Sequence, residues 1–187
     1  MKMFFAPKEI TLKDGRTAIL RSPVAEDAQG LLDYLHQISA ETDFVLRYPE
    51  ECSQYTLEKE KEIIEWWSTS ADEFTLTCFV DGKIAGNCNL HFDQKIKTRH
   101  RAQVAIALVK EFWGLGIGTK MFEEMIRVCE AREGVLQIEL DFIEGNSRAR
   151  GLYEKMGFRI VGVRPNAIRL KDGTLLNEYS MIREIKR

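Results

Sequence analysis

The chain has little that would direct it to a membrane or to nucleic acid. It contains no apolar run long enough to span a bilayer, and its first residues are too few, and too soon interrupted by Pro7, to form a signal peptide. Its formal net charge is -2, so it lacks the excess of basic residues that marks nucleic-acid binding. We therefore expect neither a membrane nor a nucleic acid as a partner.

The chain has four cysteines, and their spacing argues against two common uses. No two of them form a C-x-x-C pair, and most fall inside apolar segments, which favours free thiols in a reducing cytoplasm over disulfides or a metal site. None stands in a recognisable nucleophile context, so no covalent enzyme intermediate is implied. These cysteines are Cys52, Cys78, Cys88 and Cys129.

The remaining composition is that of a globular protein. Of the 187 residues, 44% are hydrophobic and 30% are charged, as in ordinary globular domains. A chain of this length buries a substantial core within one domain. We expect a single domain over residues 1–187.

The most informative stretch runs from Ala102 to Lys120. Residues 102–109 alternate as a strand in which both faces are apolar, which predicts a central, buried strand. Three glycines follow at alternate positions, Gly114, Gly116 and Gly118. A helix then begins, with an apolar side that repeats every fourth residue from Ile117. Its charged residues, expected on the opposite side, are Glu123, Glu124, Arg127 and Glu130.

The glycine turn therefore enters the amino terminus of a helix. Glycines let the backbone approach a ligand, and the first amides of a helix favour an anion such as a phosphate. Ordinary turn chemistry explains the glycines equally well. Two nucleotide motifs fit poorly, because Gly118-Thr119-Lys120 reverses the Walker order and the spacing of Gly114–Gly118 is too tight for a Rossmann fingerprint.

The rest of the chain predicts a mixed α/β (α+β) fold. A strand at 135–143, with Leu136 facing inward, follows the helix, so strand, helix and strand form a parallel pair with a right-handed crossover. Hairpin signals elsewhere predict a mostly antiparallel twisted sheet with helices on both faces. The hairpins are expected at 9–21, 74–92 and 158–182, further helices after Ser22-Pro23, after Thr56 and at 147–156, and a loop or broken helix at 41–55.

Two segments resemble the GNAT superfamily of acyl-CoA-dependent N-acetyltransferases. The first is the strand and turn, IAL at 106–108 followed by WGLGIG at 113–118. The second is NSRARGLYEKMGF at 146–158, similar to the family's Asn, Tyr, Glu-Lys and Gly-Phe pattern. Their order and separation match the family over nearly the whole chain. The resemblance implies a GNAT-like fold with a splayed central parallel strand pair.

The resemblance also implies how acetyl-CoA would be bound. The glycine turn would hold the pyrophosphate, the preceding strand would pair with the pantetheine arm, and Asn146 would bind the pantetheine side. Trp113 departs from the Arg or Gln of many relatives, and this puts a side-chain contribution there in doubt, although backbone amides supply most of the phosphate contacts. The implied cofactor-binding residues are Ile106, Ala107, Leu108, Gly114, Leu115, Gly116, Ile117, Gly118, Thr119, Asn146 and Tyr153.

For the reaction, the resemblance assigns Tyr153 as the proton donor to the departing CoA thiolate. An amine with a pKa near 10.4 must lose a proton before it attacks, and a carboxylate suits that role. Asp141 is the first candidate, since relatives that acetylate protein N-termini carry a Glu there, and Glu144 is the second. Asp141 could equally be solvated or bind a cationic acceptor.

The resemblance thus implies an N-acetyltransferase that uses acetyl-CoA as co-substrate, without a metal. The acceptor would be a small amine, an amino acid or a protein N-terminus, which attacks the thioester directly. The alternative is a non-catalytic acyl-CoA sensor or interaction module on the same fold, against which Asn146 and Tyr153 argue. A homodimer is possible, but no surface in the sequence requires one.

Overall fold

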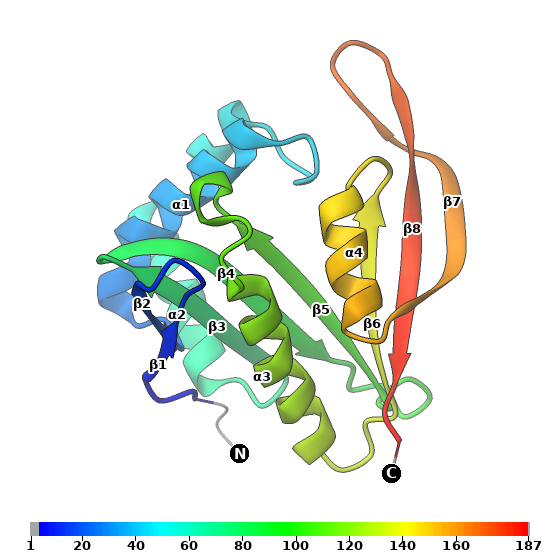
Figure 1. Cartoon of the computed structure of the whole chain (residues 1–187), viewed down its shortest axis with the longest axis horizontal. Coiled ribbons are helices and arrows are strands. Elements are labelled where there is room, and N and C mark those ends of the chain that lie inside the picture. The colour runs from blue at the N-terminus through cyan, green and yellow to red at the C-terminus, as the bar shows by residue number, and fades with distance from the viewer. Residues whose placement is uncertain (1–3, 187) are drawn as a thin grey trace. The chain divides into compact units, whose positions relative to one another are not determined.

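The computed structural model describes residues 4–186, which contain eight strands and four α-helices (Figure 1). The strand order is β1-β2-β3-β4-β5-β6-β8-β7. The elements are β1 (Lys8–Thr11), β2 (Thr17–Arg21), α1 (Ala28–Glu41), α2 (Leu57–Thr69), β3 (Glu73–Val80), β4 (Lys83–Phe92), β5 (Arg101–Leu108), α3 (Ile117–Ala131), β6 (Gln137–Ile143), α4 (Ser147–Lys155), β7 (Arg159–Arg169) and β8 (Leu175–Glu184), with short 3-10 helices at Ala25–Asp27, Pro49–Gln54 and Lys110–Phe112.

The chain forms two compact units. The first runs to Leu90 and includes Ile106–Met121, and the second comprises His91–Ala105 and the chain from Phe122 onward. The chain passes from one unit to the other three times, inside β4, β5 and α3, so no linker segment separates the units. A single domain over the whole chain stays a prediction.

The first unit is built on antiparallel hairpins. β1 pairs with β2, and β2 with β3. Gly15 in the turn between β1 and β2, and Asp81-Gly82 in the turn between β3 and β4, have left-handed conformations. α1 packs against α2 and also comes close to β4, because a methyl group at Gly30 would lie 3.3 Å from Cδ1 of Ile84. The predicted first two hairpins and the helix after Thr56 are confirmed. So is the irregular segment between α1 and α2, which holds one 3-10 helix.

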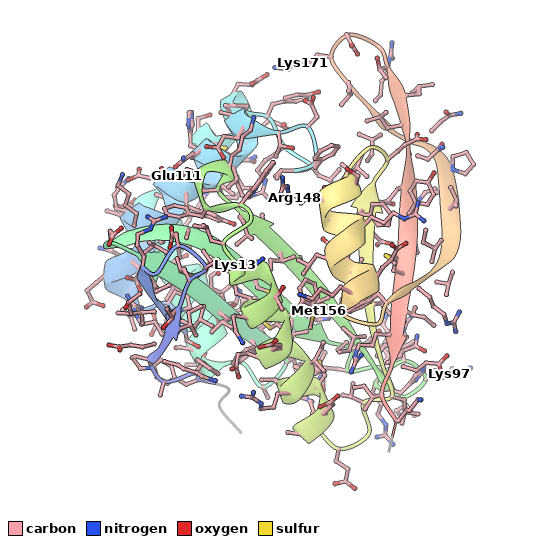
Figure 2. All side chains as sticks on the ribbon, viewed as in Figure 1. Lys13, Lys97, Glu111, Arg148, Met156 and Lys171 are labelled. Atoms are coloured by element: carbon pink, nitrogen blue, oxygen red, sulfur yellow. The ribbon has the colours of Figure 1, made fainter. Side chains whose placement is uncertain are left out.

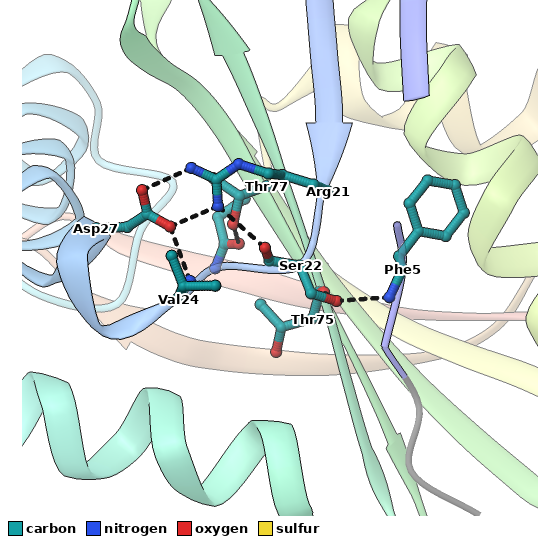
Figure 3. A network of polar contacts seen from close by, with 8 residues as sticks. Phe5, Arg21, Ser22, Val24, Asp27, Thr75 and Thr77 are labelled. Atoms are coloured by element: carbon teal, nitrogen blue, oxygen red, sulfur yellow. Dashed lines mark hydrogen bonds and ion pairs between the residues drawn. The ribbon is translucent and has the colours of Figure 1, made fainter. Parts of the chain in front are cut away.

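A polar network fixes the entry into α1 (Figure 3). Nη1 of Arg21 donates to Oδ2 of Asp27 over 2.6 Å, and the same carboxylate accepts the amide of Val24 at 2.7 Å. Ser22 Oγ donates to the carbonyl of Thr75 and accepts the amide of Phe5, each at 3.0 Å. The network joins β2 and β3 to the turn before α1.

In the second unit, β6 pairs in parallel with β5 and antiparallel with β8, and β7 pairs with β8. The parallel register covers three residues of each strand, Arg101–Gln103 of β5 and Gln137–Glu139 of β6, although both strands continue further. The predicted mixed sheet with a splayed parallel pair is confirmed. β7 is longer than expected, because bulges after Ile160 and after Arg164 let its pairing with β8 continue to Arg169.

Three burial predictions were wrong. Apolar residues on both faces of β5 do not make it buried throughout, since Ala105 is exposed and Ile106–Leu108 are half-buried. Leu136, expected to face inward, is 50% exposed because it precedes β6, with its amide bonded to His100. Glu124, expected on the outer side of α3, is 4% exposed and pairs with Arg127 at 2.6 Å.

No helix within residues 4–186 is long and apolar enough to cross a membrane. In the same part of the chain, no group of three or more His, Cys, Asp or Glu side chains could hold a metal ion. All four cysteines are free thiols and all are buried. Burial raises the pKa of Cys78 and of Cys129 to about 12, so these two thiols are weak nucleophiles at neutral pH.

Candidate functional site

The glycine turn in the first unit links the end of β5 to α3. Gly114 and Gly116 have φ of 81° and 92°, in the left-handed region that side chains with a Cβ disfavour. Gly118 already lies in the first turn of α3, so only the first two glycines are required by backbone conformation. The turn ends directly at the helix amino terminus, where the first amides lack helical carbonyl partners and attract anions.

Trp113 folds back onto the strand that precedes the turn. Its indole Nε1 donates to the carbonyl of Leu108 at 2.8 Å. This hydrogen bond links the last residue of β5 to the residue just before the glycine turn, five positions later. The tryptophan at the position that departs from many relatives therefore shapes the turn, a role that the sequence did not indicate.

The first hairpin supplies a lysine to the same turn. The amide of Lys13 donates to the carbonyl of Leu115 at 3.2 Å, and a methyl group at Gly116 would lie 3.8 Å from Cγ and Cε of Lys13. The Lys13 side chain is exposed, and its ammonium makes no ion pair within the described residues (Figure 2 labels it). From the sequence, Lys13 was only part of the hairpin expected at 9–21, because no local pattern reveals a contact with residues as distant as Leu115 and Gly116.

Two residues of α1 form hydrogen bonds to the backbone at the end of β5 and just after it. The Tyr34 hydroxyl, in a side chain that is 7% exposed, donates to the carbonyl of Ala107 at 2.8 Å. Burial raises the pKa of Tyr34, which keeps the hydroxyl protonated as a donor. At the end of α1, Oε2 of Glu41 accepts the amide of Lys110 at 2.7 Å. The contacts of Tyr34 and Glu41 thus fix the backbone at Ala107 and at Lys110, just after β5.

In the second unit, Tyr153 lies in a cluster of aromatic rings. It is 7% exposed, and its ring centroid lies 5.5 Å from that of Phe122, 6.1 Å from that of Phe142 and 6.3 Å from that of Phe158. Edge-to-face and tilted packing of this kind restricts ring rotation. The Tyr153 ring is therefore held in place by Phe122 of α3, Phe142 of β6 and Phe158, which follows α4.

Asn146 caps the helix that carries Tyr153. Its Oδ1 accepts the amide of Ala149 at 3.2 Å, which satisfies one of the first amides of α4. Its Nδ2 group makes no hydrogen bond within residues 4–186, and the side chain is half-buried. Asn146 is thus a helix cap with a donor left over for a ligand.

The two candidate carboxylates near the end of β6 both have partners. Asp141 is exposed, and its Oδ1 accepts a hydrogen bond of 2.6 Å from Ser180 of β8. Oε2 of Glu144 accepts the amide of Asn177 at 3.0 Å, while the Glu144 amide donates to the carbonyl of the same residue at 2.9 Å. Glu144 therefore extends the pairing of β6 and β8 with its side chain, a structural role that its sequence position did not suggest.

A mixed sheet in which a strand, a left-handed glycine turn and a helix follow one another defines an α/β protein. The chain belongs to the Acetyltransferase (GNAT) family, whose sequence model matches residues 35–158. The resemblance drawn from the two sequence segments is thereby confirmed. Membership implies an acyltransferase, with acetyl-CoA as the family's co-substrate.

Curated relatives are similar to the chain at low identity. The L-amino acid N-acetyltransferase AaaT of Escherichia coli (strain K12) is 28% identical over 108 residues, which are 58% of this chain and 66% of the relative. The putative [ribosomal protein bS18]-alanine N-acetyltransferase of Bacillus subtilis (strain 168) is 29% identical over 87 residues, 46% of this chain and 54% of the relative. The matched region thus spans less than two thirds of either relative.

Solved structures share the fold over most of the chain. A GNAT-family acetyltransferase from Streptococcus pneumoniae matches with a TM-score of 0.84 and 29% identity, covering 90% of this chain and 99% of the other. A ribosomal-protein-alanine N-acetyltransferase from Brucella melitensis matches with a TM-score of 0.74 and 21% identity, covering 89% and 99%. The second likeness concerns the fold alone.

Proposed function

We propose that this chain transfers an acetyl group from acetyl-CoA to a primary amine, which attacks the thioester directly. The observation that carries the proposal is the turn before α3, where Gly114 and Gly116 are left-handed and Lys13 adds an unpaired ammonium. A diphosphate needs backbone donors and a cation at one place. The family's co-substrate supplies such a diphosphate.

The binding roles follow the resemblance. The turn and the first residues of α3 hold the pyrophosphate, the backbone of β5 pairs with the pantetheine arm, and Nδ2 of Asn146 donates to the same arm. The fixed backbone of Ala107 and the free amide group of Asn146 support these roles. The residues assigned are Ile106, Ala107, Leu108, Gly114, Leu115, Gly116, Ile117, Gly118, Thr119 and Asn146.

The catalytic roles concern the proton movements. The amine nitrogen forms a bond to the thioester carbon, the carbon–sulfur bond breaks, and Tyr153 gives its hydroxyl proton to the departing thiolate. The proton that the nitrogen loses after the attack restores the tyrosine. The proton lost by the ammonium goes to a carboxylate, for which Asp141 is the first candidate, because one of its oxygens is unbonded and the side chain is exposed. Glu144 is second, because it already accepts a backbone amide.

The acceptor is a small amine, an amino acid or a protein N-terminus. We also place the protein in the reducing cytoplasm, which the four free cysteines support. The high pKa of Cys78 and Cys129 supports direct attack over a thiol intermediate.

The test is calorimetric titration with acetyl-CoA and, in parallel, with CoA that lacks its 3′-phosphate. Micromolar binding, of order 8 kcal/mol, is expected. Mass spectrometry of a panel of amines incubated with acetyl-CoA then detects acetylated product. Absence of binding overturns the proposal, and binding without turnover on any amine class supports a non-catalytic acyl-CoA protein instead.

A further inference from the structure

A row of polar side chains crosses β3 and β4 in the first unit. The hydroxyl of Thr77 donates to Oδ1 of Asn87 at 2.9 Å, and Nδ2 of Asn87 donates to Oδ1 of Asn89 at 3.1 Å. Nδ2 of Asn89 in turn donates to Oγ1 of Thr75 at 2.8 Å. These four side chains, two from β3 and two from β4, are called the amide row below.

The amide row is unusual inside a sheet. Asparagine is depleted in strands, yet β4 carries two asparagines at alternate positions, on one face. Thr75 is 3% exposed and Thr77 is 0% exposed, whereas Asn87 and Asn89 are half-buried. The row is therefore closed on the β3 side and reached by solvent at the two asparagines. Residues that break a local rule in this way commonly serve function.

Each carboxamide of the amide row is only partly used. A carboxamide has two N–H donors and can accept two hydrogen bonds, and the row uses one donor and one acceptor position on each asparagine. Neither Asn87 nor Asn89 makes a further side-chain hydrogen bond within residues 4–186. A spare donor and a spare acceptor thus remain on each half-buried side chain, and both gain from a partner.

The amide row lies beside the end of β5, the strand assigned to the pantetheine arm. The amide of Val109 donates to the carbonyl of Ala85 at 3.0 Å, and a methyl group at Gly86 would lie 3.3 Å from Cγ of Leu108. One step forward along β4 thus corresponds to one step back along β5. The two strands are antiparallel neighbours at this point.

This register puts Asn87 opposite Ala107. The same methyl group at Gly86 would lie 3.0 Å from the carbonyl oxygen of Ala107, so the two backbones are close here. Opposite residues share one face of the sheet, with Cα atoms about 5 Å apart. The side chain of Ala107 is a single methyl group, too short to cover the carboxamide beside it. The spare groups of Asn87 are therefore open toward the end of β5.

We propose that Asn87 and Asn89 bind the first peptide group of the acceptor, and that the acceptor is the N-terminus of a polypeptide. A carboxamide and a peptide group each offer an N–H and a C=O, so they can join through a pair of hydrogen bonds. The first peptide group is attached to the carbon that carries the α-amine, so its binding to the amide row keeps the amine beside the end of β5. This deepens the proposed function and rests on it.

The chemistry distinguishes a peptide from the other acceptors. A free amino acid has a carboxylate in place of the peptide group, and a carboxylate only accepts hydrogen bonds. It would leave the spare acceptors of the asparagines unpaired, and the amide row has no charge to balance it. A simple amine offers neither a donor nor an acceptor at this position. A peptide with proline as its second residue lacks the N–H of the first peptide group.

The experiment compares tripeptides with the free amino acids that form their first residue, measured as CoA release at saturating acetyl-CoA. The tripeptides carry each of the twenty amino acids in turn, followed by two alanines. Wild-type enzyme should acetylate at least one tripeptide with kcat/KM about 10- to 100-fold above that of the free amino acid. Proline at the second position of that tripeptide should lower kcat/KM about 10-fold, because one hydrogen bond is lost.

Variants of the amide row test the assignment directly. Asn87→Ala and Asn89→Ala should each raise the KM of the tripeptide about 10-fold, and the double variant should remove its advantage over the free amino acid. The proline-containing tripeptide should lose less, because it already lacks one of the hydrogen bonds, and this coupling separates recognition from misfolding. Thr77→Val keeps the shape of the side chain but no longer orients Asn87, and should raise the KM about 3-fold. The KM of acetyl-CoA should stay the same in all variants.

Gln29→Ala is the matched control, because Gln29 is an exposed carboxamide of α1 in the same unit. It should change no constant. Free amino acids used as well as tripeptides, acetylation of no tripeptide, or a tripeptide KM indifferent to both Asn87→Ala and Asn89→Ala overturn the inference, while the proposed function stands if any amine is acetylated. Loss of acetyl-CoA binding in the wild type overturns the proposed function itself.

Discussion

The two compact units treat their polar groups differently. In the first unit the groups assigned to ligands are open in whole or in part: the ammonium of Lys13 makes no ion pair within the described residues, and the carboxamides of Asn87 and Asn89 each keep a donor and an acceptor. In the second unit Oδ1 of Asn146 caps α4 and Glu144 binds the amide of Asn177, while Nδ2 of Asn146 and one oxygen of Asp141 stay open. Open groups indicate recognition, whereas bonded groups indicate positioning.

Aromatic packing positions Tyr153 in the second unit, and its hydroxyl provides the largest expected effect. Tyr153→Phe should lower kcat by about 10² to 10⁴, the usual contribution of a positioned acid, because only the proton donor is lost. The affinity for acetyl-CoA and the melting temperature should stay near wild type, since the ring remains among Phe122, Phe142 and Phe158.

Tyr179→Phe is the matched control, because that ring stacks on Phe142 with centroids 5.1 Å apart. It should retain full activity. An unchanged kcat in Tyr153→Phe would remove the hydroxyl from the mechanism and leave the second unit without a proton donor.

The two carboxylates of the second unit should separate in function. Asp141→Asn should lower kcat about 100-fold as expected for loss of a general base, with the steepest loss at low pH where the amine is most protonated. Glu144→Gln should change kcat little and lower the free energy of unfolding by about 1 kcal/mol, because a charged acceptor of the Asn177 amide becomes neutral.

Steady-state pH profiles and urea unfolding measure the two effects. Ser180→Ala serves as the control for Asp141, since it removes the 2.6 Å hydrogen bond and keeps the carboxylate. If Glu144→Gln abolishes turnover and Asp141→Asn does not, the two roles are reversed.

The glycine turn should respond to a single methyl group. Gly116→Ala places a Cβ at φ of 92°, which costs about 1–2 kcal/mol of backbone strain. If the turn relaxes to relieve that strain, its amides move, and acetyl-CoA should bind about 10-fold more weakly, as a loss of about 1.4 kcal/mol requires. Calorimetry measures the change.

Gly15→Ala tests whether strain alone accounts for the result. Gly15 has φ of 88° in the first hairpin, and nothing lies within 4 Å of an added Cβ. It should cost similar stability and leave acetyl-CoA binding intact. Equal losses of affinity in the two variants would show that the turn has no special part in binding.

The smallest effect is expected at Lys13. Lys13→Ala should weaken acetyl-CoA binding about 3- to 10-fold at low ionic strength, and the difference should shrink as salt screens the exposed charge. Lys97→Ala is the control, because Lys97, labelled in Figure 2, is an exposed lysine in the loop before β5, and acetyl-CoA binding should stay unchanged. A loss that persists undiminished in high salt would contradict an electrostatic role.

Much of the fold could be predicted because its signals are local. Alternation, glycine turns and a four-residue repeat located the strands, the hairpins and α3 close to their observed bounds. Leu136 and Glu124 were misplaced, because their exposure is decided by where β6 begins and by what packs on α3, which spacing does not encode.

The candidate site was only partly predictable for the same reason. The turn glycines and the helix cap Asn146 could be located from motifs within one segment. The contacts of Lys13 with Gly116, of Tyr34 with Ala107 and of Glu144 with Asn177 join residues far apart in the sequence. The hydrogen bonds that join Asn87 and Asn89 to β3 are likewise recognised only when the strands are placed side by side.

The hydrogen bond from Trp113 to Leu108 holds the indole beside the glycine turn, where its fluorescence can serve as a probe of binding. The indole is attached to the last residue of β5 and precedes Gly114 directly, so its emission depends on the turn's surroundings. The chain has two other tryptophans, Trp66, which is 53% exposed, and Trp67. Replacing both with phenylalanine leaves a single emitter, and titration with acetyl-CoA would then report occupancy of the turn in real time, on the timescale of a stopped-flow mixing experiment.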